Sequence, residues 1–103
     1  MTVIDTKVAL LSALVSGEGY GLEIIERVKE LTNGEIRLLQ GRVYPALREL
    51  ESEGFLESYD GEPLPERGGR PRRYYRLTAK GQGAARTQAT AITGLLRPAL
   101  GVR

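Results

Sequence analysis

The 103-residue chain contains no cysteine, no histidine and no tryptophan. The absence of cysteine excludes disulfide frameworks, thiolate nucleophiles and cysteine metal sites. The absence of histidine excludes the Ser/His/Asp and Cys/His arrangements of hydrolases and removes the commonest metal ligand. These absences argue against an enzyme, and we predict no catalytic residues, no cofactor and no metal site.

Long hydrophobic runs are absent as well. No apolar run approaches the roughly 18 residues that a membrane-spanning helix needs. Residues 1–7 include Asp5 but lack the basic segment that opens a signal peptide. We therefore expect a cytoplasmic protein that does not enter a membrane. A chain of this length forms one domain with a modest core, and because such domains often gain stability from a second copy, we expect a homodimer.

Charge is unevenly distributed along the chain, although the formal net charge is only +2. Residues 1–65 carry a net charge of −6, residues 66–80 carry +5 and residues 81–103 carry +3. A phosphate backbone is attracted by local charge rather than by average charge, so the segment 66–80 is typical of a polyanion contact. A solvated basic loop is the alternative that composition alone leaves open.

Apolar residues at helical spacing predict helices over about 5–16, 20–32, 41–53 and 79–96. We place Pro45 in the first turn of the third helix, where its missing N–H costs nothing. Gly94 and Pro98 predict that the last helix frays or ends early. Residues 35–38 alternate polar and apolar side chains, which favours either a short strand or an extended link.

Two short segments rich in aromatic and apolar residues, 55–59 and 73–77, predict strands. Residues 60–72 between them are rich in glycine and proline and predict a hairpin loop. Three helices followed by a hairpin with a basic loop is the order of a winged helix-turn-helix, so the predicted fold class is mainly α with a small β-hairpin (α+β). We expect residues 1–78 to form a DNA-binding domain and residues 79–103 to form a C-terminal dimerisation helix and tail.

Several motifs in the chain also resemble those of a known family. They are YGLEI at residues 20–24, GRVYPAL at 41–47, LE at 50–51, EGFL at 53–56 and RPRRYYRLT at 70–78. In this order and at these separations they resemble the PadR family of bacterial and archaeal transcriptional regulators over about residues 7–81. The resemblance implies a dimeric winged-helix repressor that binds a double-stranded DNA operator.

The candidate DNA-binding residues lie in the third helix and in the hairpin. They are Gln40, Arg42, Tyr44, Arg48, Arg70, Arg72 and Arg73. The resemblance implies a phosphate or base contact for Tyr44, which could instead brace the helix against the core. Arg42 stands where the family usually has a small hydroxyl residue, and it could reach a guanine edge, contact phosphate or pair with Glu49. Arg48 could contact phosphate or pair with Glu51.

Small apolar residues form a stripe along the last predicted helix, where we expect a dimer contact through Ala85, Ala89, Ile92 and Leu96. Two copies would place their third helices in successive major grooves of a pseudo-palindromic operator, with the hairpins on the backbone or in the minor groove. A small-molecule or protein effector could act on the dimer, and no residues identify one. Two alternatives stay open: a winged-helix module that binds an acidic protein surface, and a nucleic-acid-binding protein with little sequence preference.

Overall fold

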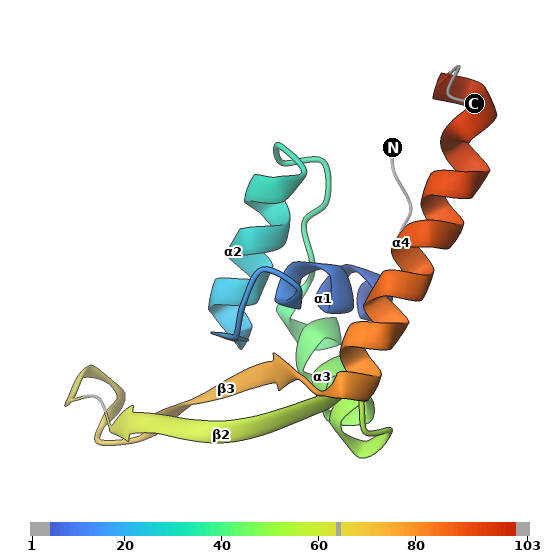
Figure 1. Ribbon diagram of the computed structural model, residues 1–103. Coiled ribbons are helices and arrows are strands. Elements are labelled where there is room, and N and C mark those ends of the chain that lie inside the picture. Colours follow the sequence, from blue (N-terminus) through green and yellow to red (C-terminus); the bar gives the residue numbers. More distant parts are fainter. Residues whose placement is uncertain (1–4, 64, 101–103) are drawn as a thin grey trace.

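The computed structural model describes residues 5–63 and 65–100, without the side chains of residue 67 and residues 92–100. Within these ranges the chain forms four α-helices, three β-strands and one 3₁₀ turn (Figure 1). They are α1 (Thr6–Leu14), β1 (Gly19–Tyr20), α2 (Gly21–Leu31), α3 (Gln40–Ser52), β2 (Leu56–Pro63), η1 (Pro65–Arg67), β3 (Pro71–Leu77) and α4 (Ala79–Leu100). This order confirms the predicted winged helix-turn-helix, which is mainly α with a small antiparallel sheet.

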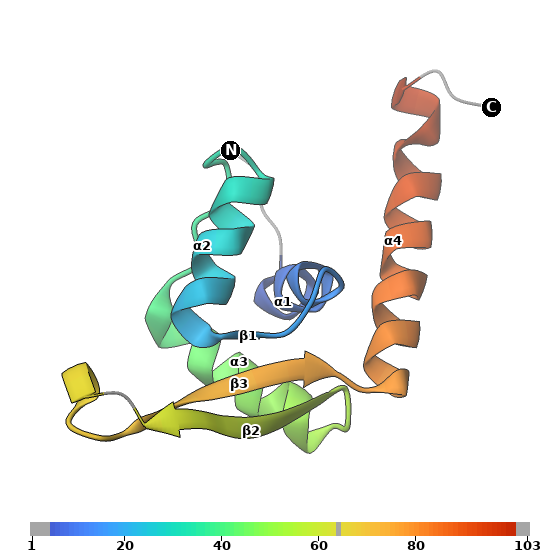
Figure 2. The ribbon, with the colours of Figure 1, turned by 60° about the vertical axis from the view of Figure 1, so that its left-hand side comes forward.

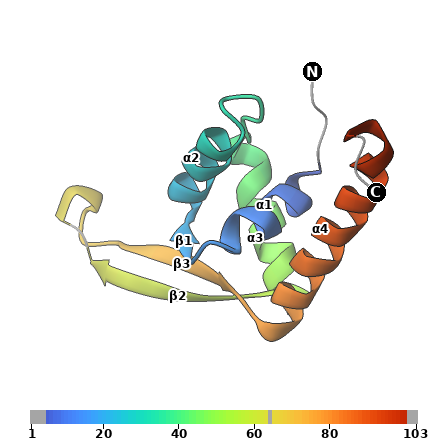
Figure 3. The same ribbon diagram turned by 45° about the horizontal axis from the view of Figure 1, so that its top comes forward.

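Helix α1 lies at the centre of the helical layer (Figure 3). Asp5 caps its first turn by accepting hydrogen bonds from the backbone N–H groups of Lys7 (2.8 Å) and Val8 (3.4 Å). The buried residues of α1 are Ala9, Leu10, Leu11, Ala13 and Leu14, because α2, α3 and α4 all pack against this helix. The other helices are therefore assembled around α1.

The rest of the core comes from α2, α3 and the sheet. The largest side chains with almost no exposed surface are Leu10, Ile24, Val43, Leu47 and Leu50. Burial of each such side chain contributes about 1.5–3 kcal/mol relative to exposure. Strand β3 is the middle strand, antiparallel to both β1 and β2, and Tyr75 on its inner face is 4% exposed. One face of the sheet therefore closes the core, while the β2–β3 hairpin extends from it as a wing (Figure 1).

The segment that precedes α2 differs from the sequence-based expectation, whereas the segment that precedes α3 follows one of its two alternatives. The sequence pattern does not predict β1, because a two-residue strand has no periodicity and is defined only by its pairing with β3. Residues 35–38 form the extended link rather than the short strand. In this link, Ile36 and Leu38 are half-buried against the core, and the Ile36 N–H donates to Thr32 Oγ1 at 3.0 Å.

Two prolines lie further inside helices than the sequence pattern predicts. Pro45 is the sixth residue of α3, so the expected first-turn position is wrong. Pro45 has no N–H to donate to the carbonyl of Gly41, so α3 continues through this position with one internal hydrogen bond fewer. The expected early end of α4 is also wrong, because the helix continues past Pro98 to Leu100. A proline this close to a helix end removes only one internal hydrogen bond.

The wing has longer strands and a shorter loop than the sequence pattern predicts. Strand β2 continues to Pro63 and β3 begins at Pro71, whereas the prediction ends the first strand at residue 59 and begins the second at residue 73. The register shifts between Asp60 and Pro63. This irregularity lets the glycine- and proline-rich segment continue the pairing, so the wing extends further from the helices.

The first half of α4 is fastened to the rest of the chain by side-chain hydrogen bonds. Thr78 caps the helix, and its Oγ1 accepts a hydrogen bond from the Gly81 N–H at 3.0 Å. The amide of Gln88 donates to the Val8 carbonyl at 2.8 Å and to Ser12 Oγ at 2.9 Å, both in α1. The second half of α4 projects away from the other helices (Figure 2).

The close approach of α4 to the α3–β2 turn predicts opposite effects for two glycines of this helix. A Cβ at Gly81 would overlap the backbone carbonyl oxygen of Phe55, whereas a Cβ at Gly83 would have nothing within 4 Å. We expect Gly81→Ala to lower the free energy of unfolding by about 2 kcal/mol or more through overpacking. Gly83→Ala should raise it by up to about 1 kcal/mol through helix propensity. Denaturant unfolding measures both, and a Gly81→Ala variant as stable as wild type would contradict the close approach.

Candidate nucleic-acid interface

The exposed face of α3 changes character along the helix. The exposed residues among the first nine of the helix are Gln40, Gly41, Arg42, Pro45 and Arg48, none of which is acidic. Acidic side chains begin at Glu49, while the opposite face of the helix is buried against the core. In helix-turn-helix proteins the N-terminal residues of the recognition helix contact base edges. The neutral and basic part of α3, up to Arg48, carries side chains that can make such a contact.

Arg42 and Arg48 are exposed, and neither takes part in an ion pair among the described side chains. The alternative partner of Arg42, Glu49, is instead 2.8 Å from Lys7 Nζ. The alternative partner of Arg48, Glu51, is engaged with the wing. Both guanidinium groups are therefore available to a ligand without the loss of an ion pair.

Lys7 of α1 covers the acidic end of α3. Its Nζ lies 2.8 Å from Glu49 Oε2 and 3.0 Å from Glu53 Oε1. Hydrogen bonds to Glu49 and then to Glu53 raise the pKa of Lys7 above its ordinary value of 10.5. The positive charge of Lys7 thereby offsets the negative charge of two carboxylates that would repel a phosphate backbone. The same ion pairs connect α3 to α1.

Glu51 connects α3 with both strands of the wing. It accepts a hydrogen bond from Ser58 Oγ of β2 and lies 3.9 Å from Arg73 Nη2 of β3. Arg73 Nη1 also lies 3.4 Å from Oδ1 of Asp60, its cross-strand neighbour. The predicted DNA contact Arg73 is therefore held by two carboxylates of its own chain. Contact with a phosphate would require its guanidinium to leave them.

The other two predicted wing arginines have different surroundings. Arg72 is half-buried, and its guanidinium carbon lies 4.5 Å from the centroid of the Tyr20 ring. Arg70 is exposed immediately before β3. The first two arginines of β3 thus differ, because Arg72 stacks on a ring whereas Arg73 is ion-paired.

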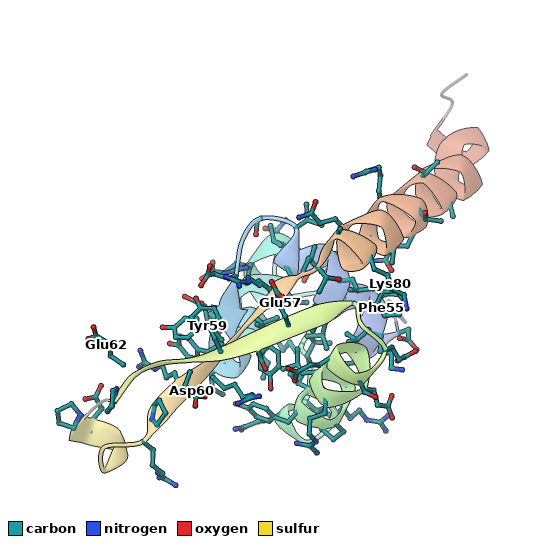
Figure 4. The ribbon with its side chains drawn as sticks, turned by 60° about the horizontal axis from the view of Figure 1, so that its bottom comes forward. Phe55, Glu57, Tyr59, Asp60, Glu62 and Lys80 are labelled. Carbon is teal, nitrogen blue, oxygen red and sulfur yellow. The ribbon has the colours of Figure 1, made fainter. Side chains whose placement is uncertain are left out.

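Carboxylates on β2 lie across from arginines on β3 (Figure 4). Arg76 Nε lies 2.7 Å from Glu57 Oε1, in addition to the pair between Arg73 and Asp60. Glu62 is exposed further along β2. Cross-strand pairing therefore offsets two of the arginines, and the +5 charge of residues 66–80 overstates the positive charge that the wing presents.

Tyr44 is half-buried and its ring covers Gly21, the first residue of α2. A Cβ at position 21 would lie 2.5 Å from Tyr44 Cε1 and 2.6 Å from its hydroxyl oxygen. This contact is the alternative role expected for Tyr44, in which the ring braces α3 against its neighbours. A DNA contact by the same side chain stays a prediction.

A row of tyrosines that the motifs do not predict crosses the outer face of the sheet. The ring of Tyr74 stacks on Tyr59, with centroids 5.5 Å apart and planes at 13°, and meets Tyr20 edge-on at 5.6 Å and 76°. Arg76 covers Tyr59 at 5.4 Å from its centroid. Strand alternation predicts that Tyr74 faces away from the buried Tyr75. The neighbours of Tyr74 depend on the strand order, which the sequence does not reveal.

The described part of the chain offers neither a metal site nor a membrane-spanning helix. No group of three or more His, Cys, Asp or Glu side chains there could hold a metal ion. No helix in that part of the chain is long and apolar enough to cross a membrane. The basic face of α3 and the wing therefore carry the candidate site.

Comparison with protein families identifies the group to which this architecture belongs. The model of the transcriptional regulator PadR-like family matches residues 10–87. The chain belongs to the PadR-like family. The matched range includes α3 and the whole wing, so the candidate interface of this PadR-like protein lies within the family domain.

Three solved structures share the fold. A transcriptional regulator from Clostridium thermocellum, Cth-833, is 26% identical, with a TM-score of 0.75 over 92% of this chain and 88% of that chain. A PadR family transcription regulator from Clostridium difficile R20291 is 28% identical, with a TM-score of 0.71 over 92% and 97%. Bacillus subtilis PadR in complex with operator DNA is 25% identical, with a TM-score of 0.70 over 81% of this chain and 44% of that chain. Comparison with curated proteins gave no significant match.

The residues of α4 that we predict at a dimer contact of this PadR-like chain differ in their exposure to solvent. Ala85 is 3% exposed and belongs to the core of the single chain, so its side chain is covered before any second copy binds. Ala89 is exposed. The side chains of Ile92 and Leu96 lie outside the described part of the structure. Ala89 and Val15 line a groove of about 620 Å³ between the end of α1 and α4.

The raised pKa of Lys7 predicts a loss of stability at high pH. Because the folded pKa lies above the unfolded value of 10.5, the ion pairs stabilise the fold fully below that value and are lost as the pH rises through the folded pKa. We expect Lys7→Met to lower the denaturant midpoint at about pH 8, and the difference from wild type to shrink towards about pH 12. Lys29→Met is the control, since Lys29 has no ion pair among the described side chains. A difference for Lys7→Met that is constant with pH would contradict this role.

Proposed function

We propose that this PadR-like chain is a homodimeric transcriptional repressor that binds a pseudo-palindromic double-stranded DNA operator. The observation that carries the proposal is the pair of exposed arginines, Arg42 and Arg48, which precede the acidic end of α3 and take part in no ion pair among the described side chains. This helix and the wing lie away from the projecting half of α4 (Figures 1 and 4). A recognition helix and a wing arranged in this way suit a major groove and its flanking backbone or minor groove.

We assign the base contact to Arg42, the third residue of α3. The N-terminal end of a recognition helix is the end that approaches base edges. A guanidinium group binds guanine O6 and N7 through two hydrogen bonds, a contact that discriminates between bases by about 1–3 kcal/mol. Gln40, Tyr44 and Arg48 are assigned to phosphates or to neighbouring bases, where they would set the position of the helix in the groove.

In the wing we assign the principal contacts to Arg70 and Arg72. Arg70 is exposed immediately before β3, and Arg72, the second residue of β3, takes part in no ion pair among the described side chains. Arg73 has a secondary part in this assignment, because a phosphate must compete with Glu51 and Asp60 for its guanidinium. The wing would therefore approach the DNA along β3, with the carboxylates of β2 turned away from the phosphates.

The second copy is assigned to α4. Ala89 is exposed beside a groove whose other wall includes Val15, an apolar side chain that is 65% exposed. A second α4 packed there, through Ala89, Ile92 and Leu96, would cover apolar surface that the single chain leaves in water. The two α3 helices would then enter major grooves about one helical turn apart. Occupancy of the operator would block access to a promoter.

The relatives support a DNA operator as the ligand. The B. subtilis PadR structure is a complex with operator DNA, and it shares the fold of this chain over 81% of its length. The matching family model describes transcriptional regulators. DNA-binding regulators of this fold have no need of a catalytic residue, in agreement with a chain that lacks both histidine and cysteine.

Selection of duplexes from a randomised library by the full chain tests this function. We expect an inverted repeat with half-sites about 10 base pairs apart. Affinity for the enriched duplex, measured by fluorescence anisotropy, should fall steeply with salt because bound arginines release counterions. Arg42→Gln should weaken binding about 5- to 100-fold and relax the base preference at one position of each half-site.

Lys29→Gln is the matched control, because it removes one cation of α2 that lies outside α3 and the wing. This variant should bind the selected duplex within about twofold of wild type. Salt-dependent binding without any enriched sequence would instead identify a non-specific nucleic-acid-binding protein. The absence of binding to any duplex would favour a module that recognises a protein surface.

The dimer assignment predicts that a charge at position 89 separates the two copies. Ala89→Glu would place a long charged side chain in a contact that small apolar residues otherwise make, which is costly to bury. We expect this variant to be a monomer by light scattering and to bind the selected duplex at least tenfold more weakly. Thr87→Glu is the control, since positions two apart on a helix face different directions. An Ala89→Glu variant that remains dimeric would contradict the assignment.

A further inference from the structure

Tyr20 and Gly21 are adjacent residues, and each contacts a different element of the candidate interface. Tyr20 is the N-cap residue of α2, with an extended backbone (φ −95°, ψ 165°), and pairs with Tyr74 of β3. Gly21 is the buried first residue of α2. A single peptide bond therefore joins the residue that contacts the wing to the residue that contacts α3.

The contact of Gly21 is with the recognition helix. The ring of Tyr44 lies so close that a Cβ at position 21 would be 2.5 Å from Tyr44 Cε1 and 2.7 Å from Tyr44 Cζ. Any side chain at this position would push the ring outward, because real Cβ atoms do not approach other atoms this closely. The absence of a side chain at position 21 thus leaves the space that the Tyr44 ring of α3 occupies against the start of α2.

The contact of Tyr20 is with the wing. Its ring lies edge-on to Tyr74 and beneath the guanidinium of Arg72, which is 4.5 Å from the ring centroid. Arg72 takes part in no ion pair among the described side chains, so the ring is the contact that orients its guanidinium. Arg73 differs in this respect, because carboxylates hold it.

We propose that the Tyr20-Gly21 dipeptide is a joint that positions the recognition helix and the wing relative to each other on DNA. Tyr20 acts through Arg72, and Gly21 acts through Tyr44. Both are positioning residues and neither contacts the duplex itself. The inference rests on the proposed DNA-binding function and adds to it the part of the fold that sets the angle between the two contacting elements.

The proposed role of Tyr20 in orienting Arg72 of the wing is tested with Tyr20→Leu and Tyr20→Phe. Leucine removes the ring under Arg72, whereas phenylalanine keeps the ring and removes only the hydroxyl. We expect Tyr20→Leu to bind the selected duplex about fivefold more weakly than wild type, and Tyr20→Phe to bind within about twofold. The control is Tyr59→Leu, which removes another tyrosine of the same row without touching Arg72. This control should stay within about twofold of wild type.

A double-mutant cycle separates positioning from a general loss of structure. In an Arg72→Gln background the ring has no guanidinium to orient, so Tyr20→Leu should cause little further loss of affinity. Gly21→Ala acts on Tyr44 instead, so its loss should add to that of Arg72→Gln. Thermal unfolding identifies variants that do not fold. If Tyr20→Leu is unfolded, Tyr20→Met repeats this test with a longer, unbranched side chain.

The affinities of these variants decide whether Tyr20 and Gly21 are positioning residues. Equal affinities of Tyr20→Leu and wild type for the duplex would overturn the proposal for Tyr20. The same conclusion would follow if Tyr20→Leu lowered the affinity as much in the Arg72→Gln background as in wild type. A Gly21→Ala variant that folds and binds the duplex like wild type would overturn the proposed role of Gly21 in positioning Tyr44. Failure of the proposed DNA-binding function gives a different result, because the wild-type chain would then enrich no duplex from the library.

Discussion

The burial of α1 among the other helices is the interaction on which the rest of the structure depends. Each of α2, α3 and α4 carries an apolar face that would stay in water without α1. Hydrogen bonds and ion pairs then fix how each neighbour is oriented on this scaffold. Lys7 fastens the acidic end of α3, and Gln88 fastens α4. The recognition helix and the projecting helix are thus positioned by the same nine-residue element.

The distribution of ion pairs divides the arginines of the candidate interface into two groups. Arg73 and Arg76 are held by carboxylates of β2 and α3, which stiffen the wing and link it to the recognition helix. Arg42 and Arg48 have no such partner, and Arg72 is held by an aromatic ring. A phosphate or base edge can bind the second group without displacing an intramolecular carboxylate. This division gives the protein a small set of contacts rather than a uniformly basic surface.

Much of the fold can be predicted from the sequence because its signals are local. Helical periodicity, the glycine after α3 and the β-rich segments around a glycine- and proline-rich loop predict three helices, a hairpin and a last helix in the observed order. The failures concern features that neighbours decide. Strand β1 exists only through its pairing with β3, and α3 and α4 continue through Pro45 and Pro98, where local propensity predicts a helix start and a helix end.

The sequence by itself determined which side chains could meet a polyanion, because charge and residue type are local properties: a basic segment, a recognition-helix motif and no histidine or cysteine. Only the tertiary structure decided which of those side chains are available. Glu51 meets Arg73, and Gly21 receives Tyr44, across separations that no local pattern encodes. Ala85, which lies on the small-residue stripe, is buried in its own chain for the same reason. Pairing and burial depend on neighbours from distant positions, and the packing around α1 brings these neighbours together.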